Sequence, residues 1–122
     1  MGRVIGAGTI VRDLTDRLRA EAANARLAAI VESSNDAIIG KTLQGVITSW
    51  NRAAERMYGY SAHDAIGQSI AMLVPDERRV ELAELLAQVA AGRSIPHLES
   101  VRRRRDGRLI EVSLTVSPIH DR

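Results

Sequence analysis

Three histidines are the first side chains in this sequence that could bind a metal or move a proton. No two of His63, His97 and His120 have the short spacing of paired metal ligands, so we predict no metal site and expect all three at the surface. Cysteine is absent, which excludes disulfides, thiolate zinc sites, cysteine nucleophiles and flavin–cysteine photochemistry. Neither Gly-x-Ser-x-Gly nor His-Glu-x-x-His occurs, and the carboxylates are scattered. The residues therefore do not point to an enzyme.

Two glycine-containing segments resemble phosphate-binding loops only in part. Residues 40–42, Gly-Lys-Thr, match the end of a P-loop, but the position of its leading glycine is Asn35 and the segment falls in a predicted hairpin. Gly2, Gly6 and Gly8 do not have the spacing of a dinucleotide fingerprint. We therefore predict no nucleotide site.

The densest cluster of charge is residues 102–105, which are all arginine. The chain has 17 basic and 15 acidic side chains, a net charge of +2. Every cation except one is arginine, which does not titrate in the usual range and moves the pI to about 9.7. Such a run could bind a phosphate backbone, but alternate side chains of a strand point to opposite faces. We therefore favour an ordinary exposed hairpin over a nucleic-acid surface.

The elements that must position these side chains fall into three zones. Residues 1–15 predict a strand with glycines in its first half. Residues 16–33 contain no glycine or proline and predict a helical linker. Apolar residues near heptad spacing allow a short coiled coil or a helix on its own domain: Val11, Leu14, Leu18, Ala25 and Ala28, with Glu21 interrupting the seam. Residues 34–122 form the globular zone.

The globular zone begins with a hairpin and two short helices. Strands at 37–40 and 46–50 flank a turn in which Gly45 can take a positive φ. Asn51 can cap a helix over 53–58. Residues 61–64 match a capping box for a second short helix.

A longer helix is predicted from Pro75 to Gly92. Its apolar stripe is Leu82, Leu85, Leu86 and Val89, and the side chains expected to face water are Glu77, Arg78, Glu81 and Glu84. Strands at 97–104 and 108–117 follow, joined by the turn Asp106-Gly107 and ended by Pro118. The inward side chains of the last strand are Ile110, Val112, Leu114 and Val116. Paired strands with helices between them predict an α+β fold with an antiparallel sheet.

Several motifs of this zone occur in order and resemble the PAS domain family. The densest is residues 45–55, Gly-Val-Ile-Thr-Ser-Trp-Asn-Arg-Ala-Ala-Glu, followed by Gly-Tyr-Ser at 59–61. Other matches lie at 65–67, 73–75, 104–107 and 113–119. The resemblance implies a PAS-like five-stranded antiparallel sheet, with small helices and one long helix on one face. It also implies an interior concavity that can hold a small ligand.

One departure from the family pattern concerns the last strand, which is central in PAS sheets. Residues 2–15 look like that missing piece placed at the front, either from a preceding repeat or by circular permutation. An empty central slot would expose two unpaired strand edges. We therefore predict that residues 3–11 fill it, from the same chain or from a partner in a strand-swapped dimer. A straight helix of about twenty residues spans roughly 30 Å and favours the swap.

The resemblance also suggests site residues. The pocket candidates, each of which could equally be an ordinary core residue, are Ile38, Trp50, Met57, Leu82, Leu86, Val112 and Leu114. The relay candidates are Arg12, Asp13, Thr15 and Leu18. Haem-binding relatives often place a histidine early in the long helix, where this chain has about Leu82, so haem held in that way is not expected. The cofactor otherwise stays open.

By resemblance, the chain is a non-catalytic PAS sensory and protein-interaction module of a multidomain signalling protein, such as a histidine kinase or a cyclic-di-GMP enzyme. A ligand or partner would shift the populations of two arrangements. We expect a cytoplasmic homodimer with adjacent signalling domains and no membrane contact, since the chain has no long apolar run. A ligand-free dimerisation module is the alternative, and a nucleic-acid binder is less favoured.

Overall fold

Five antiparallel strands form one sheet in the order β3-β2-β1-β5-β4. The computed structural model describes residues 2–14 and 36–121. The strands are β1 (Val4–Asp13), β2 (Ala37–Thr42), β3 (Ile47–Trp50), β4 (Ile95–Arg103) and β5 (Leu109–His120). The helices are α3 (Arg52–Tyr58), α4 (Ala62–Ala65) and α5 (Arg79–Ala90), with 3-10 turns η2 (Ile70–Leu73) and η3 (Asp76–Arg78). The expected α+β class and five-stranded sheet are confirmed.

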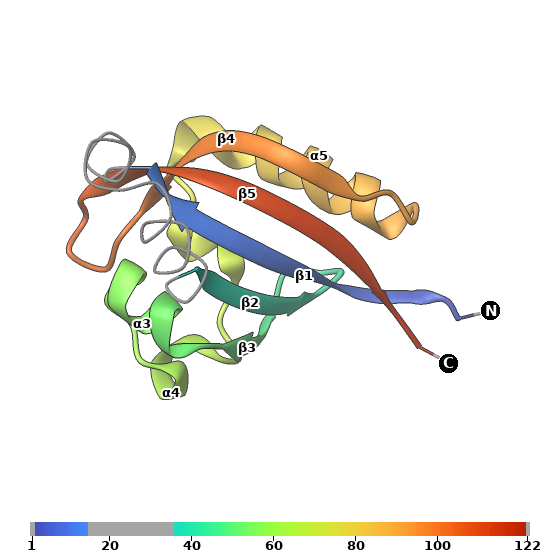
Figure 1. The fold of residues 1–122 in the computed structure, drawn as a ribbon, viewed down its shortest axis with the longest axis horizontal. Coiled ribbons are helices and arrows are strands. Elements are labelled where there is room, and N and C mark those ends of the chain that lie inside the picture. The colour runs from blue at the N-terminus through green and yellow to red at the C-terminus, as the bar shows by residue number, and fades with distance from the viewer. Residues whose placement is uncertain (1, 15–35, 122) are drawn as a thin grey trace, which may run out of the picture.

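The first strand of the chain lies at the centre of the sheet (Figure 1). In β1, Thr9 is in register with Ile39 of β2 and with Val116 of β5. The prediction that residues 3–11 fill the central slot is confirmed, and here β1 pairs with strands of its own chain. The strand swap stays a prediction, and the helix expected at 16–33 lies outside the described residues.

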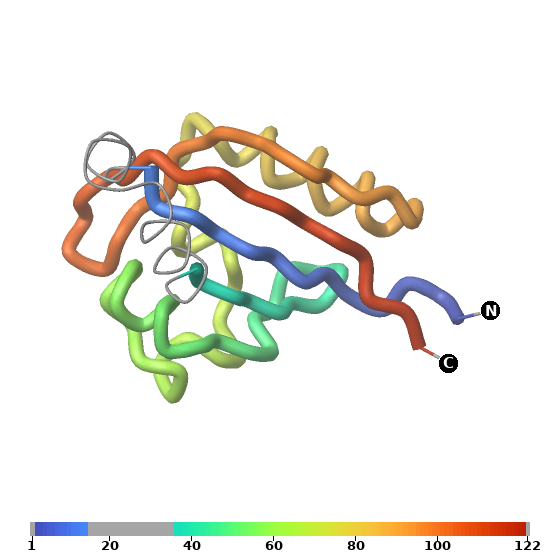
Figure 2. Tube along the Cα trace, in the orientation of Figure 1, coloured from blue at the N-terminus to red at the C-terminus, as the bar shows by residue number. Residues whose placement is uncertain are grey.

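The two ends of the described chain lie side by side (Figure 2). Val4 is in register with His120, and the β1–β5 register shifts between Val4 and Gly6. The Arg3 backbone N–H donates to Asp121 Oδ1 at 2.8 Å, and the Asp121 N–H donates to the Arg3 carbonyl at 3.0 Å. These bonds close the sheet at the end farthest from the β4–β5 turn.

Capping residues fix the short helices where the sequence predicts them. Asn51 Oδ1 accepts from the Ala54 N–H at 2.9 Å at the start of α3, and Gly59, with φ of 83°, ends that helix in the left-handed conformation. Ser61 Oγ accepts from the Asp64 N–H at 3.1 Å at the start of α4. The two predicted short helices are confirmed.

Several boundaries differ from the sequence prediction, and two of the differences involve a proline. Residues 76–78 form the 3-10 turn η3, so α5 begins at Arg79 rather than at Pro75. β5 continues past Pro118 to His120. The last β4–β5 pair is Ile95 with Val116, so Pro118 lies past the end of β4. Proline has no N–H to donate, but no β4 carbonyl lies opposite it there to need one.

An aliphatic core joins the sheet to the helices, and α5 packs across β1 and β5. The inward faces of α5 and β5 are confirmed by burial of Leu82, Leu85, Val89, Ile110, Val112, Leu114 and Val116. Trp50 closes one side of the core, since its indole N–H donates to the Tyr60 carbonyl at 2.9 Å and its ring contacts Tyr58. Within residues 2–14 and 36–121, no helix has the length and apolar character needed to cross a bilayer.

Candidate functional site

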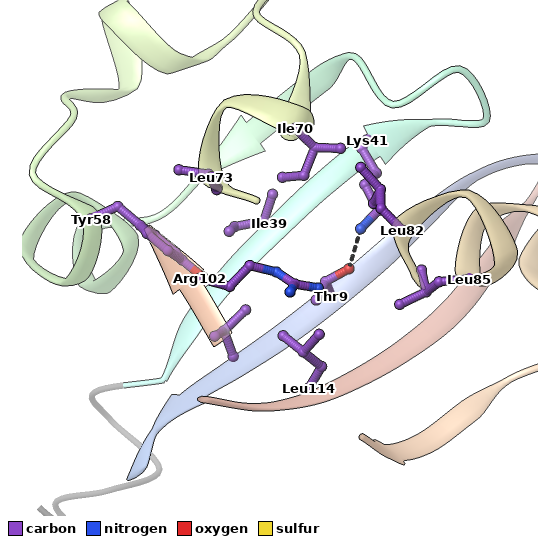
Figure 3. A pocket seen from close by; sticks show the side chains of 11 residues that line it. Thr9, Ile39, Lys41, Tyr58, Ile70, Leu73, Leu82, Leu85, Arg102 and Leu114 are labelled. Atoms are coloured by element: carbon purple, nitrogen blue, oxygen red, sulfur yellow. Dashed lines mark hydrogen bonds between the residues drawn. The ribbon is translucent and has the colours of Figure 1, made fainter. Parts of the chain in front are cut away.

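A small cavity of about 20 Å³ lies between the sheet and the helices (Figure 3). A volume of this order holds a water-sized group or an ion of a few atoms. Most of the lining is aliphatic, but four residues bring a polar end. The lining is Thr9, Val11, Ile39, Lys41, Tyr58, Ile70, Leu73, Leu82, Leu85, Arg102 and Leu114.

Lys41, the only lysine of the sequence, lies inside the protein at 4% exposure. Its position in β2 directs the side chain to the same face as Ile39. The ammonium donates to the Thr9 hydroxyl of β1 at 3.0 Å. Burial, and to a smaller extent the positive charge of Arg102, together lower the pKa of Lys41 from 10.5 to about 8. Lys41 is therefore a buried base that can change charge near neutral pH.

Arg102 is the second buried cation, at 5% exposure. Its Nη1 donates to Ser100 Oγ at 2.8 Å and to the Val101 carbonyl at 2.9 Å, and lies 3.5 Å from Glu81 Oε1. The Ser100 hydroxyl also donates to Glu81. This network joins β4 to α5 and holds the guanidinium at the edge of the cavity.

Glu81 is the carboxylate that balances Arg102. Burial by itself would raise the pKa of Glu81, but the Ser100 hydroxyl, Arg102 and Arg78 favour the ionised form and lower the pKa overall. The Arg78 Nη1 lies 3.3 Å from the second Glu81 oxygen. The expectation that Glu81 faces water as a free surface charge is therefore wrong, because β4 brings Ser100 and Arg102 against α5.

Tyr58 contributes a fully enclosed phenol. Burial raises the pKa of Tyr58, opposed by Arg102 and reinforced by Asp13. The Tyr58 hydroxyl therefore stays protonated and can donate a hydrogen bond. In Figure 3 this hydroxyl points toward Arg102.

The seven pocket candidates occupy different places. Leu82 and Leu114 line the cavity. Trp50, Met57 and Val112 are buried in the core outside the lining, and Leu86 is partly buried. Ile38 does not face the interior, since its side chain is 51% exposed. β2 alternates from a buried Ala37, so the inward residue is Ile39, one position further on.

Two of the four relay candidates lie at the end of β1. Arg12 Nε is 3.5 Å from Asp36 Oδ1, which joins the end of β1 to the start of β2. Asp13 is in register with Val112 of β5. Thr15 and Leu18 lie outside the described residues.

Sequence reasoning missed Lys41 and Arg102. The signal was alternation: Lys41 is two positions after the apolar Ile39, and Arg102 is two positions after the buried Ser100. A cation at an inward strand position marks either a buried ion pair or a binding group.

The arginine run is divided, as strand alternation predicts. Arg102 is inside, while Arg105 Nη1 lies 3.2 Å from Asp64 Oδ2 and its guanidinium lies over the Tyr60 ring. The four guanidinium groups therefore do not form one basic surface.

The histidines lie away from the cavity. His63 is on α4, His97 on β4 and His120 on β5, and none is part of the lining. Among the residues that the structure describes, no group of three His, Asp or Glu side chains could hold a metal ion. Leu82, at the position where a histidine would hold haem, is part of the apolar wall.

The sheet order and the helical layer define a PAS-like α+β fold, and comparison with known families agrees. The family model of the PAS fold matches residues 25–122. The chain therefore belongs to the PAS fold family, a family of non-catalytic sensory domains. β1 lies before the matched residues, so the central strand comes from outside the segment that the family describes.

Two sensor proteins and one solved domain are similar to this chain. The signal transduction histidine-protein kinase AtoS of Escherichia coli (strain K12) is 35% identical over 92 residues, covering 75% of this chain and 15% of AtoS. The sensor protein FixL of Bradyrhizobium diazoefficiens is 30% identical over 95 residues, covering 74% of this chain and 19% of FixL. A PAS domain from Colwellia psychrerythraea is 26% identical with a TM-score of 0.56, covering 80% of this chain and 98% of that one. The chain thus spans less than a fifth of either curated relative.

Proposed function

We propose that this chain is the sensory module of a larger signal-transduction protein, and that a small ligand in the cavity changes the position of β1. The observation that carries the proposal is the dual role of β1. The strand supplies Thr9 and Val11 to the cavity and ends at Asp13, where the chain leads toward the relay candidates Thr15 and Leu18. A change at the lining therefore has a direct covalent route out of the sheet.

The relay works as a population shift between two positions of the central strand. A ligand that binds the Lys41 ammonium alters its bond to Thr9, which is one of the attachments of β1 to β2. The Arg12–Asp36 ion pair at the end of β1 then transmits the displacement to the chain that follows. The ligand can shift this equilibrium only by the difference in its affinity for the two positions.

The similarity to sensor kinases supports a multidomain host. AtoS is named a histidine-protein kinase and FixL a sensor protein, and the chain covers 15% and 19% of them. We therefore propose a cytoplasmic sensor kinase in which an adjacent domain performs catalysis. This module senses and does not itself catalyse.

Native mass spectrometry of the purified protein beside its denatured intact mass tests the ligand. We expect an adduct that disappears on denaturation, or one that forms when small metabolites are added. Hydrogen exchange then tests the relay, since ligand should change protection at 12–13 and in the residues after them. Exchange that is indifferent to bound ligand throughout β1 would count against the mechanism.

A homodimerisation module is the second candidate function. On the outer face of the sheet, Ile10 is 43% exposed and stands in direct register with the exposed Ile38. Two adjacent apolar side chains on the face opposite the core are typical of a surface that another protein covers. A second copy of this chain fits, because a symmetric contact places like side chains against like.

Light scattering of matched variants tests this second candidate. We expect Ile10→Asp and Ile38→Asp to shift the protein toward monomer. The control is Val80→Asp, at an exposed apolar position on α5 away from the sheet. Equal masses for all three variants and wild type would contradict the outer-face dimer.

A further inference from the structure

Two buried cations and two hydroxyl groups meet at one small cavity. We propose that this cavity is an anion site, in which Lys41 and Arg102 hold a small monovalent anion of a few heavy atoms, such as formate. Thr9 and Tyr58 complete the polar part of the lining. The inference rests on the proposed sensory function, because it states the chemistry of the ligand that the pocket detects.

Among residues 2–14 and 36–121, the charges around the cavity leave one positive charge in excess. Lys41 and Arg102 contribute two positive charges, and Glu81 balances one of them from the far side of Arg102. None of the eleven lining residues is a carboxylate. Taking a charge out of water is costly unless an opposite charge accompanies it. One monovalent anion would neutralise the group, whereas a divalent anion would exceed the available charge.

Unused donors face this space. An ammonium has three N–H groups, and Lys41 uses one of them on Thr9. The hydrogen bonds of Arg102 to described residues all come from Nη1, so its Nε and Nη2 N–H groups are available as donors to a ligand. Figure 3 shows both side chains reaching toward Thr9 from opposite sides. A small oxyanion between them would accept from both cations.

Tyr58 adds a neutral donor. Its side chain is 1% exposed, and its protonated hydroxyl can donate to an acceptor in the cavity. An anion beside Arg102 would supply that acceptor.

The size and the walls of the cavity restrict the ligand. About 20 Å³ has room for a few heavy atoms and excludes a nucleotide or a macrocycle. The walls formed by Ile39, Leu82 and Leu114 keep bulk water away, which strengthens the attraction between the cations and an anion. Formate, the smallest carboxylate, suits this restricted space and offers one oxygen to each cation.

Binding should weaken as Lys41 loses its proton. Burial and the positive charge of Arg102 from β4 set this titration. The other titratable groups around the cavity are Tyr58 of α3, Glu81 of α5, which pairs with Arg102, and Asp13 of β1, which acts on Tyr58. With the pKa of Lys41 at about 8, the charged form dominates at pH 7 and disappears above pH 9. A bound anion would raise the pKa of Lys41.

Lysine-selective ¹³C labelling gives a direct test, because Lys41 is the only lysine and yields one side-chain signal. The protein is titrated at pH 7 with sodium formate and, separately, with formamide, a neutral molecule of the same size, at constant ionic strength. We expect a saturable shift with formate and none with formamide. We also expect formate to raise the apparent pKa of Lys41 and the melting temperature.

Two variants complete the experiment. In Lys41→Met we expect the formate-dependent rise in melting temperature to disappear, and in Tyr58→Phe we expect formate to bind several-fold more weakly. Equal binding of formate and formamide would overturn the anion site while leaving a ligand pocket and the proposed function intact. If neither binds, the anion site is wrong, and the native mass measurement decides the proposed function independently. If Lys41→Met does not fold, the wild-type Lys41 signal decides by itself.

Discussion

The Lys41 ammonium donates to the Thr9 hydroxyl at 3.0 Å, across two strands whose pairing brings together residues 32 positions apart. The bond lies at the cavity and joins the central strand to β2. The charge of Lys41 and the seating of β1 are therefore linked. This connection gives the first prediction, which concerns pH.

We expect the free energy of unfolding to rise between pH 7 and pH 10. The pKa of Lys41 is about 8 in the folded protein and 10.5 ordinarily, so the unfolded chain binds more protons in this interval and stability increases with pH. The rise should be roughly 2–3 kcal/mol by urea denaturation. Above pH 10 the raised pKa of Tyr58 acts in the opposite direction, because the unfolded phenol ionises first.

Lys41→Met is the matched variant for this prediction. It lacks the titrating group, so its stability should be flat across the same interval, and at pH 7 it should be at least as stable as wild type. Parallel pH profiles for the two proteins would show that Lys41 is not the group responsible.

The second prediction concerns the ion pair between α5 and β4. Glu81→Gln leaves the buried Arg102 guanidinium without its carboxylate and should cost on the order of 1–3 kcal/mol of unfolding free energy at pH 7. Because the pKa of Glu81 is lowered in the fold, its contribution is present above the pKa of the unfolded chain and is lost as the pH falls. The cost of Glu81→Gln should therefore shrink in acid.

Glu84→Gln, on an exposed turn of the same helix, is the control and should change stability by less than about 0.5 kcal/mol. Denaturation at pH 7 and at pH 3 distinguishes the cases. A cost for Glu81→Gln that matches the control at both pH values would contradict the role of the pair.

The third prediction concerns Asn51, which joins a helix to a strand. Its Oδ1 accepts from the Ala54 and Ile38 N–H groups, and its Nδ2 donates to the Asp36 carbonyl at 3.1 Å. Asn51→Ala removes all three bonds and should cost roughly 2–3 kcal/mol by chemical denaturation. Ser61→Ala removes one cap from α4 and should cost only about 1 kcal/mol. Equal losses of unfolding free energy in Asn51→Ala and Ser61→Ala would contradict the role of Asn51 in joining the helix to the strand.

The fourth prediction concerns the central strand. Deleting residues 1–14 exposes the edges of β2 and β5 that pair with β1. We therefore expect the truncated chain to lose its cooperative unfolding transition and to self-associate. A synthetic peptide of residues 3–14 should restore the transition. The point control is Ile10→Thr on the outer face, with a loss below about 1 kcal/mol. A truncated chain that unfolds at the wild-type midpoint would refute the requirement for β1.

Local signals in the sequence were sufficient for most of the fold. Asn51 and Ser61 carry caps whose chemistry acts within three residues, and Gly59 ends α3 because it tolerates a positive φ. The alternating side chains of β5 identify its inward face without reference to any partner. The place of β1 was predicted only through family resemblance, because its partners lie far away along the chain.

The candidate site was less accessible to sequence reasoning. Leu82 and Leu114 were identified, but the polar side chains of the cavity depend on long-range placement. Glu81 looks like a solvent-facing helix residue until β4 brings Arg102 beside it. The strand begins at residue 37 as predicted, but Ala37 and Ile39 face the core and Ile38 faces outward. Nothing in local spacing reports which distant charge will share a cavity.

The register of Val4 with His120 has a kinetic consequence. β1 can complete its pairing with β5 only after the chain closes a loop of nearly its whole length, which raises the contact order and slows folding. Until then, the same stretch of a second molecule can enter the vacancy first, so refolding yield should fall as concentration rises. The β1–β5 pairing at the centre of the sheet is therefore expected to form late, and low protein concentration should favour its formation within one chain.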